Sequence, residues 1–95
     1  MADSQRFDSV WDALEDSREK AENMKLRSEL VIQIRQHVEA LGLSQQNAAR
    51  QLGITQPRLS DLMRGRIDKF SLDKLVNILA RAGKHLEVRV VDDAA

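Results

Sequence analysis

The sequence predicts an all-α domain that ends in one β-strand. Neither glycine nor proline occurs in the first 41 residues, which leaves this stretch free to form helix. Three later glycines, Gly53, Gly65 and Gly83, each end a short amphipathic segment. A segment with β-branched residues and period two follows near the C-terminus. The length of 95 residues suits one small domain.

The composition excludes several classes of protein. There is no cysteine, which excludes a disulfide framework, a zinc finger and a thiol nucleophile. His37 and His85 are isolated, and no pair of acids is flanked by nucleophile or base partners, so we expect no metal site, no cofactor and no catalytic residue. The start, MADSQRFD, has no signal-peptide pattern, and no apolar run approaches the ~20 residues of a membrane span. We expect a cytoplasmic protein with no membrane partner.

An acidic helical segment is predicted over residues 1–23. These residues hold seven acids and three bases, a net charge of −4. An apolar stripe crosses the segment at helical spacing and consists of Phe7, Val10, Trp11 and Leu14. The stripe either packs on the domain or the dimer partner, or docks another protein. The segment can continue into the helix that follows.

The main domain is predicted over residues 24–84, and a long helix leads into it. This helix begins between Ser17 and Asn23 and ends at Gly42, because apolar residues recur every three or four positions. Its predicted inner face consists of Leu26, Leu30, Val31, Ile34, Val38 and Leu41.

Two short helices joined by a tight turn follow. Ser44 and Thr55 are N-cap residues, and Gly53 ends the first helix. Pro57 falls in the first turn of the second helix, where its missing N–H costs nothing, and Gly65 ends that helix. The predicted inner faces are Ala48, Ala49, Leu52, Leu59, Leu62 and Met63, with Ile54 in the turn. The arrangement is that of a helix-turn-helix, whose second helix enters the DNA major groove.

A fourth helix and a strand complete the predicted fold. Ser71 caps the helix and Gly83 ends it; its inner face is Leu72, Leu75, Val76, Ile78 and Leu79. Apolar and polar side chains then alternate over residues 85–90, which indicates a strand over residues 85–91. The rest of the chain offers no second strand. We therefore expect residues 85–95 to be a dimerisation strand and tail that pairs with another copy.

The strand predicts a homodimer. In an antiparallel pair centred on Val88, Glu87 of one copy lies opposite Arg89 of the other, which is a favourable cross-strand pair. The residues expected in this contact are Leu86, Glu87, Val88, Arg89 and Val90.

The segment LSQQNAARQLGITQPRLSDLMRG, residues 43–65, resembles the Cro/cI (Xre) family of bacterial and phage regulators. The matching anchors are Leu-Ser-Gln, Ala49, Leu52-Gly53-Ile54, the Thr-Gln helix start, Leu59-Ser60 and Gly65. The resemblance covers about residues 26–83 and departs at Ser60, where many members carry glutamate. It implies a lambda-repressor-like fold of four to five helices that binds double-stranded DNA.

The resemblance also implies roles for single residues. The family's base-reading positions are matched by Gln56, Pro57, Arg58 and Asp61, and its phosphate-contacting region by Ser44, Gln45, Thr55, Arg64, Arg66 and Lys69. Glutamine can read adenine, arginine can read guanine, and aspartate can accept from cytosine. Arg58 can reach either a base or a phosphate. Asp61 can instead pair with Arg58 or Arg64 on the helix surface.

The charge distribution agrees with a DNA-binding role. Fifteen Lys+Arg and fifteen Asp+Glu cancel over the whole chain. Residues 24–70 nevertheless hold eight bases and four acids, a net charge of +4, whereas residues 71–95 hold four of each. The basic excess therefore falls on the helix-turn-helix, as phosphate contacts require. We predict a homodimeric repressor on a palindromic operator, with half-sites about one helical turn apart.

Two alternatives stay open. Small Xre-family proteins with a strand dimer resemble antitoxins of the HigA kind, which bind a basic RelE/HigB-type ribonuclease toxin and repress their own operon. The acidic segment 1–23 would suit such a basic partner. The other alternative is a protein-interaction module that does not bind DNA.

Overall fold

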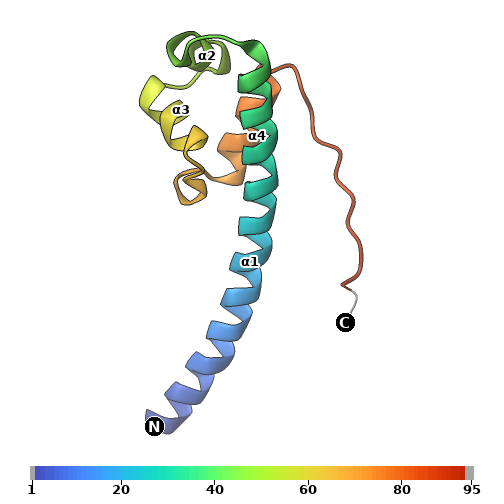
Figure 1. Cartoon of the computed structure of the whole chain (residues 1–95). Coiled ribbons are helices and arrows are strands. Elements are labelled where there is room, and N and C mark those ends of the chain that lie inside the picture. The colour runs from blue at the N-terminus through green and yellow to red at the C-terminus, as the bar shows by residue number, and fades with distance from the viewer. Residues whose placement is uncertain (1, 94–95) are drawn as a thin grey trace.

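Four α-helices make up the fold of residues 2–93, and three short ones gather at one end of a long one (Figure 1). The computed structural model describes the backbone of residues 2–93 and the side chains of residues 17–93. The helices are α1 (Ala2–Leu41), α2 (Gln45–Leu52), α3 (Gln56–Met63) and α4 (Leu72–Arg81), with a 3₁₀ turn, η1 (Ile67–Lys69), before α4. The predicted all-α class and the number of helices are confirmed.

α1 is one continuous helix, without a break between the predicted acidic segment and the predicted long helix. No glycine or proline falls between residues 2 and 41, so the backbone can stay helical throughout. The apolar stripe predicted at Phe7, Val10, Trp11 and Leu14 lies outside the described side chains. Among the described residues, no helix is both long enough and apolar enough to cross a membrane.

The core forms where α4 packs along the later turns of α1, and α2 and α3 close over them (Figure 1). Its buried residues are Val31, Ile34, Val38, Ala48, Ala49, Leu52, Leu59, Leu62, Phe70, Leu75, Ile78 and Leu79. The prediction that Leu26 and Val76 lie on the inner face is wrong. Leu26 is 47% exposed, because the short helices cover only the later turns of α1. Val76 is 41% exposed, because it lies one position off the i, i+3, i+4 stripe of α4.

The three predicted N-caps are confirmed. The Ser44 hydroxyl accepts from the Asn47 N–H at 3.2 Å, the Thr55 hydroxyl from the Arg58 N–H at 3.3 Å, and the Ser71 hydroxyl from the Lys74 N–H at 3.2 Å. Each bond satisfies a main-chain donor that the helix itself leaves free. The starts of α2, α3 and α4 are therefore set by the local sequence.

The C-terminal segment runs back beside α1 without regular secondary structure (Figure 1). The predicted strand over residues 85–91 is thus not formed within a single chain, because no described segment of residues 2–93 offers it a ladder partner. Leu86 lines one depression together with Leu30 and Ile32 of α1. Further along, the Arg18 guanidinium forms an ion pair with the Asp93 carboxylate at 2.5 Å. Three valines of this segment stay largely exposed: Val88, Val90 and Val91.

Candidate nucleic-acid interface

Backbone hydrogen bonds define the turn between α2 and α3. The Gly53 N–H donates to the Arg50 carbonyl at 3.2 Å, and the Ile54 N–H donates to the Ala49 carbonyl at 3.0 Å. Gly53 has a φ of +71°, a left-handed conformation that glycine adopts without strain. Ile54 packs against the core. The two helices therefore meet in a helix-turn-helix arrangement.

The first turn of α3 presents a free outer face. Leu59 and Leu62 bury the opposite face of this helix, each with an exposed fraction of 0%. Gln56 and Pro57, both predicted to read bases, are exposed beside the Thr55 cap. Both side chains are therefore accessible from solvent at the start of α3.

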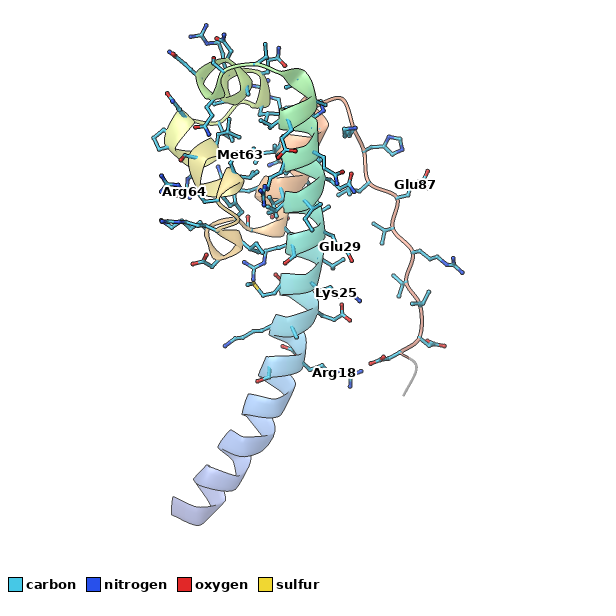
Figure 2. The ribbon with its side chains drawn as sticks, in the orientation of Figure 1. Arg18, Lys25, Glu29, Met63, Arg64 and Glu87 are labelled. Atoms are coloured by element: carbon cyan, nitrogen blue, oxygen red, sulfur yellow. The ribbon has the colours of Figure 1, made fainter. Side chains whose placement is uncertain are left out.

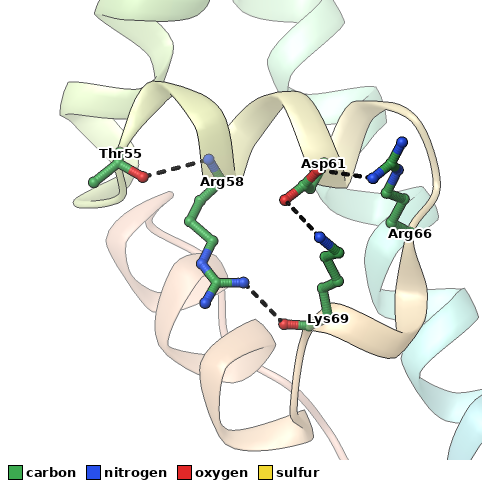
Figure 3. Close-up of polar contacts among 5 residues, drawn as sticks. All are labelled: Thr55, Arg58, Asp61, Arg66 and Lys69. Atoms are coloured by element: carbon green, nitrogen blue, oxygen red, sulfur yellow. Dashed lines mark hydrogen bonds and ion pairs between the residues drawn. The ribbon is translucent and has the colours of Figure 1, made fainter.

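Asp61 lies further along α3 and faces two cations of the segment that follows this helix (Figure 3). Its carboxylate oxygens lie 3.8 Å from Arg66 Nη1 and 3.9 Å from Lys69 Nζ. These partners differ from Arg58 and Arg64, which the sequence offers as alternatives to base reading. One predicted base-reading acid is therefore joined to two predicted phosphate ligands.

Arg58 points toward the loop before α4 (Figure 3). Its Nη1 donates to the Lys69 carbonyl at 3.3 Å, and its Cζ lies 5.9 Å from the centroid of the Phe70 ring. From α1, Arg27 Nη1 donates to the Phe70 carbonyl at 3.3 Å. Two arginines thus hold consecutive carbonyls and position this loop. Sequence reasoning missed both contacts, because no helical period relates residues so far apart.

The predicted phosphate ligands lie in three places. Ser44 and Gln45 stand at the start of α2, Thr55 stands at the start of α3, and the others follow the end of α3. All are exposed: Ser44, Gln45, Thr55, Arg64, Arg66 and Lys69. The Ser44 and Thr55 hydroxyls accept main-chain N–H groups, so each keeps its own O–H to donate to a phosphate oxygen.

Two further cations gather near the start of α3. Arg50, Arg58 and Lys74 line one open depression with Gly53, Ile54 and Thr55. Arg50 and Lys74 are absent from the site that the sequence predicts. The charge distribution along the sequence could have pointed to Arg50, because this residue belongs to the basic excess of residues 24–70. It could not have pointed to Lys74, because residues 71–95 hold equal numbers of acids and bases.

Comparison with known proteins supports this assignment of the fold. A family model described as a helix-turn-helix domain matches residues 13–91, which is more than half of the chain. A solved chain named as an XRE family transcriptional regulator is 27% identical, with a TM-score of 0.71. The alignment covers 79% of this chain and 84% of that chain. No curated protein matches the sequence.

Proposed function

The chain belongs to the helix-turn-helix family, in its XRE-type form, and from this premise we propose that it is a DNA-binding transcriptional regulator that acts as a homodimeric repressor. One observation carries the proposal. α3 is capped at Thr55 and buries Leu59 and Leu62, and it leaves Gln56 and Pro57 free at its outer face. This is the presentation that a recognition helix needs in order to reach base edges.

The exposed cations supply the affinity in this proposal. Arg64, Arg66 and Lys69 follow the end of α3, and phosphate contacts at that end set the depth and angle of the helix in the groove. Gln56 and Pro57 are the proposed base-reading residues. Arg58 and Asp61, which the sequence also offers for this role, are engaged with the segment that follows α3. No residue is proposed to be catalytic.

The homodimer is proposed through the C-terminal segment. Val88 and Val90 are 83% and 90% exposed, so they present apolar surface that a partner could bury. Antiparallel pairing about Val88 would give residues 85–91 the ladder that a single chain lacks. Two copies related by a two-fold axis would place two α3 helices on half-sites about 34–36 Å apart. Occupation of such a palindrome near a promoter would block transcription.

A salt-controlled mobility shift tests the function. Duplexes selected from a random library by the full chain, and the DNA upstream of its own gene, are the probes. The proposal expects a specific complex that weakens steeply with salt and protects a palindromic sequence. The proposal is rejected if the chain binds no duplex, binds all duplexes equally, or binds them without dependence on salt. The remaining hypothesis would then be a protein-interaction module.

A second candidate is an antitoxin, and one observation favours it. α1 projects well beyond the three short helices (Figure 1), and its described residues 17–23 are all exposed. The segment 1–23 carries a net charge of −4, which suits a basic ribonuclease of the RelE/HigB type. Copurification with the product of the neighbouring gene would test this role. It is rejected if that product is not bound and does not arrest growth.

A further inference from the structure

We infer that Arg50, Arg58 and Lys74 form a second phosphate-binding surface, which holds the DNA backbone beside the N-terminal end of α3. The inference rests on the proposed DNA-binding function and deepens it. It adds Arg50 and Lys74 to the interface, and it assigns Arg58 to a phosphate and not to a base.

Geometry is the first argument. The three cations come from three different helices, α2, α3 and α4, and they converge on one open depression. The other residues that line it are Gly53, Ile54 and Thr55, so its wall contains no acid. A depression with three cationic side chains and a hydroxyl fits an oxyanion such as a backbone phosphate.

Charge is the second argument. Arg50 and Lys74 have no ion-pair partner among the residues whose side chains the structure describes. Arg66 and Lys69, by contrast, are already paired with Asp61. Cations that converge without an acid repel one another, and a bound polyanion removes that repulsion. The unpaired group is therefore better prepared to receive a phosphate than the paired one.

Continuity is the third argument. Arg58 lines the depression and also donates to the Lys69 carbonyl, so it joins the depression to the cations that follow α3. The resulting basic band follows the eight residues of α3, a length of about 12 Å. One DNA strand carries a phosphate for every ~3.4 Å of the duplex axis, so a band of this length can meet several phosphates of one strand.

The test compares salt dependence of binding in charge-removing variants of the full chain. Arg50→Gln and Lys74→Gln are each titrated with the selected duplex and with a random-sequence duplex of equal length. Each lost phosphate contact should flatten the plot of log affinity against log salt by about 0.9. When salt is raised from about 50 to 200 mM, the affinity of the Arg50→Gln/Lys74→Gln double variant should therefore fall by a factor ~12-fold smaller than that of the wild-type chain.

Lys25→Gln is the matched control, because it removes one exposed charge from α1 outside the depression (Figure 2). The inference predicts a wild-type slope for this variant, and equal losses on both duplexes for the Arg50 and Lys74 variants. Circular dichroism confirms that each variant is folded. Wild-type slopes for Arg50→Gln and Lys74→Gln overturn the inference and leave the DNA-binding function intact. A wild-type chain that binds no duplex overturns both.

Discussion

The Asp61 carboxylate lies 3.8 Å from the Arg66 guanidinium, so a side chain predicted to read a base partly neutralises one predicted to hold a phosphate. Lys69 stands at 3.9 Å from the same carboxylate. Both distances exceed hydrogen-bond range, which makes the pairs loose. A DNA phosphate that approaches Arg66 would compete with Asp61 for it.

Removal of this acid is therefore expected to strengthen DNA binding. Asp61→Asn should raise affinity by up to about fivefold per cation released, since partly exposed ion pairs contribute at most ~1 kcal/mol. The gain should be the same on selected and random duplexes in a mobility shift. Asp68→Asn removes an equal charge from an exposed position of η1 and should have a smaller effect. A loss confined to one base position would show instead that Asp61 reads that base.

Gln56 is expected to carry sequence discrimination. Gln56→Ala should cost ~1–3 kcal/mol on the selected duplex and leave the affinity for random duplexes nearly unchanged, because only a base contact is lost. Binding to a panel of single-base-substituted duplexes should locate the position. Gln36→Ala changes an exposed glutamine of α1 and serves as the control. Normal discrimination by Gln56→Ala would remove this residue from the base-reading set.

The turn before α3 is expected to depend on the absence of a side chain at Gly53. A Cβ there would lie 2.5 Å from Arg81 Nε, and the residue has a φ of +71°. Gly53→Ala should lower the free energy of unfolding by ~1–2 kcal/mol from the left-handed backbone, plus a smaller cost of displacing the flexible Arg81 guanidinium. Urea denaturation measures the sum of the two terms.

Gly42 provides the comparison for that experiment. Its φ is +63°, but a Cβ there would meet nothing within 4 Å. Gly42→Ala should therefore show the backbone cost alone, and Gly53→Ala should be the more destabilising. In an Arg81→Ala background the two substitutions should become equal. If the difference persists without Arg81, contact with that guanidinium is not its cause.

The register of the proposed dimer can be tested by charge reversal. Glu87→Arg or Arg89→Glu alone should weaken dimerisation by roughly 1–2 kcal/mol, because like charges would then face each other at two symmetry-related places. The double reversal should restore the wild-type dissociation constant. Light scattering over a dilution series reports the oligomeric state. A wild-type chain that is monomeric at micromolar concentration, or a double variant no better than either single one, contradicts the pairing about Val88.

Much of the fold could be predicted because it depends on local signals. Ser44, Thr55 and Ser71 each cap a helix three residues before the N–H that they accept, a spacing that is visible in the sequence. Leu59 and Leu62 lie on the buried face of α3, as helical periodicity requires. Periodicity could not show where the packed part of α1 starts, since that depends on the reach of other helices. Leu26 was therefore misplaced.

The sequence by itself determined the helices, their caps and the turn that joins α2 to α3, because each rests on contacts between residues a few positions apart. Only the tertiary structure decided which charges meet. Asp61 faces Arg66 and Lys69, and Arg50 and Lys74 line one depression although they lie on different helices, because the packing of the helices sets the distances between charges. The C-terminal segment depends on both. The sequence shows its alternation of apolar and polar side chains, but a strand forms only when another backbone supplies its hydrogen bonds.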